Sequence, residues 1–367
     1  MARRLHPQGG FQVVIKIANS QRGHVYFSKI DSNDCIVGKA WFPQPARIRP
    51  VLSVLLITFP FFALVLCGYL ATRARLLPLP AIPGLNAFVL FFALPCLLYR
   101  FGAQTPIGQL LDPAVAGVYL LCGLLMVAGT VWLTRGPRTN WNDAAFGALV
   151  AAFPNSGFMG VPLLVALLGA QAAGPVIVTI AVDMVVTTSL CVALSRLDSA
   201  GTHGVAVALR SALRGMATNP MPWSIALGAL ASALQFTLPG PVDKTVAMLA
   251  DAASPVALFT IGAVLARSQM NQHEQVLARD YVPIALAKLL AHPLLVWLTG
   301  HGAIALGAPL SPLALTVLVL LAALPSASNV SLLAERFGAH NGRIARIILV
   351  STALAFMSFS AAVALLI

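Results

Sequence analysis

Charged side chains are scarce in this chain, at 9% of 367 residues, whereas a soluble domain has about a quarter. Hydrophobic residues make up 59% of the chain. This composition indicates a membrane bundle that keeps its apolar surface in lipid. The few charges are mostly basic, with a net charge of +12, but they are scattered singly between apolar runs and form no patch interleaved with aromatic residues. They predict loops that orient the protein in a bilayer, and they do not favour a nucleic-acid partner.

Cysteine is also sparse, and its spacing carries no chemistry. The five cysteines form no CxxC pair and no Cys/His cluster, so we expect neither a metal site nor a disulfide framework. The sequence also lacks a Walker loop, an HExxH motif and a GxSxG motif. We therefore expect no enzyme, no catalytic residue and no cofactor.

Long apolar runs are what the chain has in abundance. Ten of them are close to the ~20 residues that cross a ~30 Å hydrocarbon core as a helix. They cover residues 51–71, 79–99, 114–134, 144–169, 173–195, 221–239, 246–266, 281–299, 311–337 and 347–366. The longer connection at 196–220 contains "GVAVALRSALRGMA", whose apolar side and two arginines are typical of a helix lying in the interface. The sequence predicts an all-α polytopic membrane protein with a cytoplasmic linker at 196–220.

The basic residues of the loops predict the orientation of these segments. Alternate loops, beginning with the one between the first and second segments, hold twelve Lys and Arg, and the intervening loops hold only Arg100 and Lys244. Because positively charged loops stay in the cytoplasm, the richer loops are predicted to be cytoplasmic and both termini to lie outside.

Residues 1–50 do not fit this pattern. They carry eight Lys and Arg and two Asp, and they contain no spanning segment. They also lack the basic-then-apolar order of a signal peptide. Two interpretations stay open: a translation start assigned too early, with the protein beginning near Val51, or a real disordered basic tail. We assign this tail no function.

The two halves of the chain resemble each other weakly. Segment four reads "LVAAFP" up to Pro154 and segment nine reads "LLAALP" up to Pro325, while "ALPCLLY" at 93–99 matches "ASPVALF" at 253–259. Such short matches arise easily by chance, but the loop charges require the same arrangement. A unit of five spans ends on the opposite side from its start, so a tandem copy must be inverted. We expect two inverted five-helix repeats, at 51–195 and 221–367.

The fourth segment contains residues that interrupt a helix. The stretch "AAFPNSGFMGVPLL" at 151–164 carries Pro154, Gly157 and Gly160. A broken helix survives in hydrocarbon only beside protein or a watery cavity, because each unpaired backbone group costs several kcal/mol. If Pro325 breaks the ninth segment likewise, two unwound stretches cross near the midplane and present positive helix ends to an anion. The alternative is a proline kink used only for packing.

Few ionisable residues lie inside the predicted spans, where each is expensive. Asp183 falls near the middle of segment five and is a candidate ion-coupling site. Lys288 and His292 are spaced i,i+4 on segment eight, so they share a face; Lys288 is a second coupling candidate, although it could also extend to the interface. His292 is equally typical of a hydrogen-bonded packing residue. Asp251 is interpreted as a solvated position near the edge of its segment.

Several motifs resemble one known family. "FPNSGFMGVPLL" is similar to the Pro-Asn-x-x-x-x-Gly-x-Pro signature of auxin efflux carrier family transporters, and "LPSASNVSLLAERFG", "ASPVALFTIGAVLA" and "ATNPMPWSIALGAL" are similar to further stretches of it. The resemblance covers about 51–367. It implies ten spans in two inverted halves, helices four and nine crossing at their prolines, and a transport bundle moving against a scaffold. The short central loop resembles the compact bacterial type, annotated for malonate or malate, in the cytoplasmic membrane.

By this resemblance, Pro154 and Asn155 contact substrate, and Pro325 and Asn329 line the opposite side of the crossing. Segment nine has no glycine beside its proline, so its unwinding is less strongly predicted than that of segment four. The full candidate set for substrate binding is Pro154, Asn155, Ser156, Gly157, Pro325, Ser326 and Asn329.

These observations predict a secondary transporter that moves a small organic anion, a mono- or dicarboxylate, by alternating access. Asp183, with Lys288, is the candidate for coupling to protons or sodium. The predicted partners are the anion and the lipid bilayer, with a homodimer left open. Two rival interpretations are a membrane-embedded ligand sensor, which would need an output segment that the sequence lacks, and a passive channel.

Overall fold

The computed structural model describes residues 12–14, 24–31, 34–41, 48–106, 108, 112–136, 139–197, 210, 220–270 and 276–367. The chain divides into two compact units, residues 1–52 and 53–367. In the first, strands β1 (Gln12–Val14), β2 (His24–Asp31) and β3 (Asp34–Trp41) form an antiparallel sheet in the order β1-β2-β3. Most of the predicted linker at 196–220, including its interfacial helix, lies outside the described residues.

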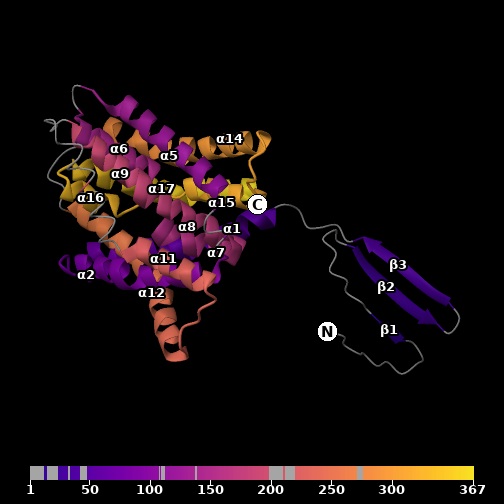
Figure 1. Cartoon of the computed structure of the whole chain (residues 1–367). Helices are drawn as coiled ribbons and strands as arrows, with labels where there is room; N and C mark the ends of the chain where they lie inside the picture. Colours follow the sequence, from indigo (N-terminus) through magenta and orange to yellow (C-terminus); the bar gives the residue numbers. More distant parts are fainter. Residues whose placement is uncertain are drawn as a thin grey trace. The chain divides into compact units, whose positions relative to one another are not determined.

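The described residues of the second unit fold into helices (Figure 1). Within the described ranges, six helical stretches are long and apolar enough to cross a membrane. These are Ala81–Gln104 (α2, η1 and α3), Pro113–Thr134 (α5), Ala170–Leu194 (η3, α8, η4 and α9), Gly240–Met270 (α12), Val282–Ala305 (α13, η7 and α14) and Asn341–Leu366 (α17). The other predicted segments hold α1 (Ile48–Arg73), α11 (Pro220–Ala233) and two interrupted helices. A multi-pass helical membrane protein is thus confirmed, and the number of ten spans stays a prediction.

Side-chain caps explain where several helices begin. Asp112 accepts hydrogen bonds from the backbone N–H groups of Ala114 and Val115 at the start of α5, and Ser311 accepts one from Ala314 at the start of α15 (Pro312–Ala322). In both helices a proline follows the cap, at the position where its missing N–H costs nothing.

Two helix pairs approach so closely that only glycine fits between them. A Cβ on Gly262 of α12 would lie 1.8 Å from the carbonyl oxygen of Val65 on α1, and one on Gly68 would lie 1.9 Å from that of Phe259. Gly228 of α11 and Gly102 of α3 meet in the same way. Small residues drive helix association in lipid, where apolar burial offers little.

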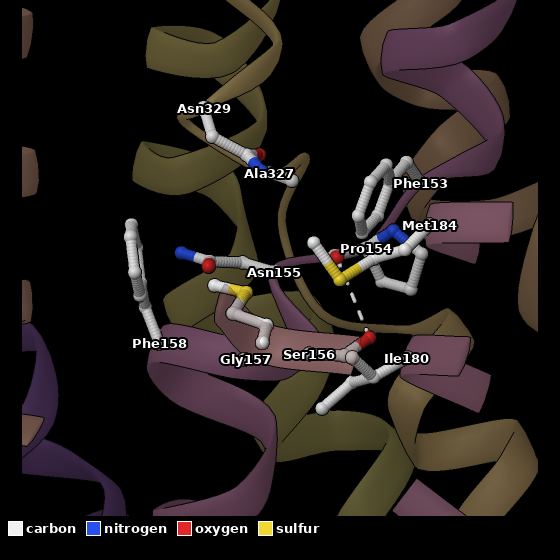
Figure 2. A pocket seen from close by; sticks show the side chains of 11 residues that line it. Phe153, Pro154, Asn155, Ser156, Gly157, Phe158, Ile180, Met184, Ala327 and Asn329 are labelled. Atoms are coloured by element: carbon white, nitrogen blue, oxygen red, sulfur yellow. Dashed lines mark hydrogen bonds between the residues drawn. The ribbon is translucent and has the colours of Figure 1, made fainter. Parts of the chain in front are cut away.

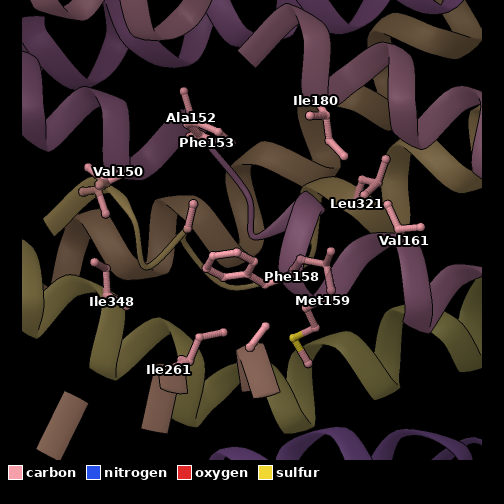
Figure 3. Close-up of a cluster of buried hydrophobic side chains, with 14 of the residues drawn as sticks. Val150, Ala152, Phe153, Phe158, Met159, Val161, Ile180, Ile261, Leu321 and Ile348 are labelled. Atoms are coloured by element: carbon pink, nitrogen blue, oxygen red, sulfur yellow. The ribbon is translucent and has the colours of Figure 1, made fainter. Parts of the chain in front are cut away.

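The core surrounds two interrupted helices. One consists of α6 (Trp141–Ala152), the π-helical turn η2 (Ser156–Gly160) and α7 (Val161–Leu168); the other consists of α15 and α16 (Val330–Arg336). Side chains from both pack together with neighbours on α8 (Ala173–Val182), α12 and α17 (Figure 3). The interruptions therefore lie in the most buried part of the described unit.

Candidate functional site

The two interrupted helices meet at their breaks. The backbone leaves helical geometry at Phe153 and re-enters it at Ser156, and a second non-helical stretch follows Ala322. The N–H of Asn155 donates to the carbonyl of Pro325 at 2.8 Å, and the N–H of Ala327 donates to that of Phe153 at 3.0 Å. Pro154 and Ser326 are thereby paired as in an antiparallel bridge. Each break thus pairs backbone groups that the other break leaves free. This offsets the main cost of interrupting a helix in lipid, which is unpaired backbone N–H and C=O groups.

A small cavity opens beside this crossing (Figure 2). Its volume is about 20 Å³, which is room for about one water molecule. The described residues that line it include no charged side chain. They are Phe153, Pro154, Asn155, Ser156, Gly157, Phe158, Ile180, Met184, Met221, Ala327 and Asn329.

The polar groups in this lining come from both breaks. Asn155 is only 4% exposed, and Asn329 is half-buried on the opposite segment. Within the described part of the chain, neither amide side chain hydrogen-bonds to another residue, whereas the Ser156 hydroxyl donates to the carbonyl of Pro154. A Cβ on Gly157 would meet nothing within 4 Å. Both amides therefore have donors and an acceptor left for a polar ligand in the cavity.

The sequence candidates separate into those that line the cavity and those that do not. Pro154, Asn155, Ser156, Gly157 and Asn329 line it. Pro325 and Ser326 belong to the crossing itself, where they make backbone hydrogen bonds, and lie outside the lining.

Asp183 does not itself line the cavity, but its sequence neighbour Met184 does. Asp183 is the first residue of the π-helical turn η4 (Asp183–Thr187), and it is completely buried. The Tyr119 hydroxyl of α5 donates to one carboxylate oxygen at 2.7 Å, and Thr187 donates to the other at 3.1 Å. Both oxygens therefore have a hydrogen-bond donor, as a carboxylate in a low-dielectric interior requires.

Lys288 is also completely buried, within the π-helical turn η7 (Ala287–Ala291). Its Nζ donates to the carbonyl of Ala322, the last residue of α15, at 2.7 Å, and lies 2.9 Å from Nδ1 of His292. Among the described residues, Asp183 and Lys288 form no ion pair within 4.0 Å. Because it is buried, the Lys288 side chain does not extend to the membrane interface. His292 is one of its hydrogen-bond partners.

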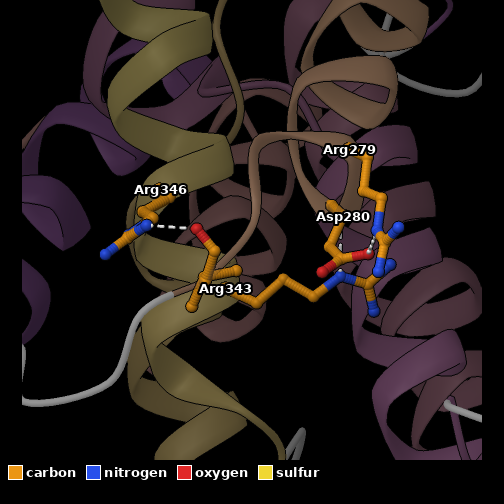
Figure 4. Close-up of polar contacts among 5 residues, drawn as sticks. Arg279, Asp280, Arg343 and Arg346 are labelled. Atoms are coloured by element: carbon orange, nitrogen blue, oxygen red, sulfur yellow. Dashed lines mark hydrogen bonds and ion pairs between the residues drawn. The ribbon is translucent and has the colours of Figure 1, made fainter.

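A second polar cluster joins α6 and α17, and its residues lie outside the lining of the cavity. Arg343, 7% exposed, donates from Nε to the carbonyl of Asp280 (Figure 4). A terminal nitrogen of Arg343 donates to the carbonyl of Asp143. These contacts to carbonyls fasten loops to helices. Asp251 forms an exposed ion pair with Arg100 at 3.0 Å, which agrees with a solvated edge position.

The sequence did not identify several residues of this region. Tyr119 and Ser351 were not singled out, because a lone tyrosine or serine in a span is usually a packing residue. Ile180, Met184 and Met221 line the cavity from other helices, and nothing in an apolar run marks such positions. Among the described residues, no group of three or more His, Cys, Asp or Glu is placed to hold a metal ion.

Comparisons with known proteins identify the family of this chain. The sequence pattern of the family described as "Membrane transport protein" matches residues 53–363. The chain is 30% identical over 303 residues, 81% of its length and 91% of the relative's, to a protein of Rhizobium meliloti (strain 1021) named "Putative malonate transporter". It is 25% identical over 287 residues, 77% of its length and 87% of the relative's, to the "Uncharacterized transporter YfdV" of Escherichia coli (strain K12). The chain therefore belongs to the membrane transport protein family, the family of the auxin efflux carriers that its fourth segment resembles.

Proposed function

We propose that this chain is a secondary transporter that carries a small organic anion across the cytoplasmic membrane by alternating access. The observation that carries the proposal is the crossing of two interrupted helices, joined by backbone hydrogen bonds around a cavity with two unpaired amides. Interrupted helices meeting inside the membrane are the usual substrate site of secondary transporters.

The proposed architecture is ten spans in two inverted five-helix halves. The pattern of contacts supports it. The contact between α1 and α12 joins segments one and seven, and its counterpart after exchange of the two halves is the contact between α11 and α3, which joins segments six and two. Likewise, the contact between α5 and α6, in segments three and four, corresponds to that between α14 and α15, in segments eight and nine. The crossing itself is unchanged by this exchange. Both close pairs also use glycine at the point of approach.

The proposed substrate is a mono- or dicarboxylate. The amides of Asn155 and Asn329 offer donors to carboxylate oxygens. The first break is also followed by the helix formed by η2 and α7, and the N-terminal end of a helix favours an anion. The name of the Rhizobium relative makes malonate the first acid to test. A cavity of about 20 Å³ is too small for such an acid, because it has room for about one water. Binding therefore requires the cavity to widen, as alternating access demands.

Coupling to protons or sodium is proposed to involve Asp183, with Lys288 as its charged neighbour. Support comes from their complete burial, since ionisable groups inside a membrane are usually functional. The proposed setting is the bacterial inner membrane, with both termini periplasmic.

The test is counterflow into proteoliposomes with a panel of labelled acids that includes malonate. A carrier shows saturable counterflow, whereas a channel does not. Replacing Asn155 by alanine removes a donor and an acceptor from the cavity, so we expect counterflow to fall at least about tenfold, the cost of one hydrogen bond to a charged group.

The matched control is Asn86→Ala, which removes the same side chain from α2 (Ala81–Phe88), outside the cavity lining. It should retain normal counterflow, and both variants should keep the melting temperature of the parent protein. Normal counterflow by folded Asn155→Ala protein would show that Asn155 does not bind substrate. Counterflow that does not saturate would contradict a carrier mechanism.

A further inference from the structure

The break in α15 frees one backbone acceptor and one donor that a continuous helix would pair. In an α-helix the carbonyl of Ala322 would accept from the N–H of Ser326, four residues on. Here the Ser326 N–H donates to the hydroxyl of Ser351 on α17 at 3.2 Å. The Ala322 carbonyl accepts from Lys288 Nζ at 2.7 Å. Two buried side chains from other helices therefore replace this one helical hydrogen bond.

The remaining groups at the crossing are satisfied differently. Asn155 and Phe153 of the first break bond to Pro325 and Ala327 of the second, backbone to backbone. Lys288 and Ser351 thus supply the contacts from outside the crossing, and of these two residues only Lys288 carries a charge. Loss of its contact would leave a buried carbonyl without its donor, which is unfavourable in a low-dielectric interior.

Lys288 also lies at one of two helix ends that meet at the crossing. The helices α6 and α15 both direct their C-terminal ends toward the crossing, and a helix C-terminus carries about half a negative charge. Such ends oppose the binding of an anion. The described lining of the cavity has no charged side chain of its own. When it is protonated, Lys288 at the last carbonyl of α15 offsets one of the two negative ends.

We propose that Lys288 is a positioning residue for the cavity, which caps the interrupted end of α15 and makes the crossing more favourable for an anion. It acts through the helix end rather than by touching substrate. The capping role stands on the hydrogen bonds alone, and the effect on anion binding rests on the proposed function.

Hydrogen exchange tests the cap without any substrate. In the full-length protein, Lys288→Met keeps a long side chain but removes the donor, and Lys288→Gln keeps a donor on a shorter, uncharged side chain. We expect exchange in peptides covering 319–329 to become at least about tenfold faster in Lys288→Met, the equivalent of one hydrogen bond. Ser351→Ala should accelerate exchange in the same peptides. Unchanged exchange in folded Lys288→Met protein would overturn the cap.

Counterflow of labelled malonate tests the electrostatic role. Lys288→Met and Lys288→Gln should each raise the half-saturating malonate concentration about tenfold, because the lost charge acts on binding. Ser351→Ala is the matched control, since it loosens the same break without changing charge, and it should shift half-saturation by less than about twofold.

Equal shifts in Ser351→Ala and the Lys288 variants would mean that Lys288 acts only structurally, and an unshifted half-saturation in both Lys288 variants would also overturn the electrostatic role. If the parent protein moves no acid of the panel, the proposed function and the anion preference fail together, while hydrogen exchange still decides the cap.

Discussion

Asp183 illustrates what a single carboxylate needs inside a membrane protein. It is completely buried among apolar helices, and its two oxygens accept hydrogen bonds from Tyr119 and Thr187. An unsatisfied polar group at such a place would cost several kcal/mol. The two hydroxyls therefore stabilise the position from which Asp183 is proposed to act.

Tyr119→Phe removes the shorter of these two hydrogen bonds without changing the ring. We expect the variant to lose about 1–3 kcal/mol of stability, because one buried carboxylate oxygen is left without its donor. A thermal melt of the detergent-solubilised protein measures the loss. Tyr69→Phe is the matched control: its hydroxyl donates to Gln269 at a half-buried site, where water can replace it, so its melting temperature should fall less. Equal melts for Tyr119→Phe and the parent would show that the carboxylate does not depend on this contact.

The sequence could identify those residues of this region that are energetically unfavourable in an apolar helix, but not those whose role depends on a spatial neighbour. A proline or a charge inside an apolar run is visible because it is unfavourable there, so Pro154, Asp183 and Lys288 could be named in advance. Tyr119 and Ser351 could not, because their partners lie 64 and 25 residues away in sequence. Only the packing of the helices brings these pairs together.

At the scale of helices, close approach at glycine defines the contact between α1 and α12. The Cβ positions of Gly68 and Gly262 are each occupied by a backbone carbonyl of the opposite helix. Backbone atoms cannot rotate away as a side chain can. These two glycines should therefore be much less tolerant of substitution than glycines that face open space.

Gly262→Ala tests this interface. The new methyl group would lie 1.8 Å from the Val65 carbonyl oxygen, so the helices must separate, and overpacking of this kind costs about 1–3 kcal/mol or more. The melting temperature in detergent should fall accordingly. Gly117→Ala provides the matched control on α5, because its Cβ would meet nothing within 4 Å and alanine favours the helix. If both variants melt like the parent, the two helices are not held at this distance.

The sequence predicted where helices lie better than how they wind. Apolar runs set the approximate limits of α5, α12 and α17, because burial of a spanning length in lipid depends on composition alone. The π-helical turns at Asp183 and Lys288 interrupt two runs that read as continuous helices. Hydropathy does not predict a π-helical turn, because the extra residue in the turn leaves the apolar composition of the run unchanged. Such turns often lie at functional sites.

For the whole molecule, the distribution of charge and the order of contacts are independent arguments for the same topology. The loop charges number twelve against two, and they require segments that alternate in direction. Close contacts recur when the two halves are exchanged: the α1–α12 approach at glycine corresponds to the α11–α3 contact. A duplicated unit with an odd number of spans satisfies both, because its second copy must be inverted.

Cysteine labelling in spheroplasts tests this topology. In a variant whose native cysteines are replaced by serine or alanine, Leu306→Cys and Leu76→Cys offer matched positions, 91% and 80% exposed, in loops predicted to lie on opposite sides. We expect a membrane-impermeant maleimide to label Leu306→Cys in intact spheroplasts, and to label Leu76→Cys only after the membrane is permeabilised, because the arginines beside Leu76 hold that loop in the cytoplasm. The reverse pattern would invert the orientation but keep the repeat. Labelling of both positions from outside would place them on the same side, which two inverted five-span halves do not allow.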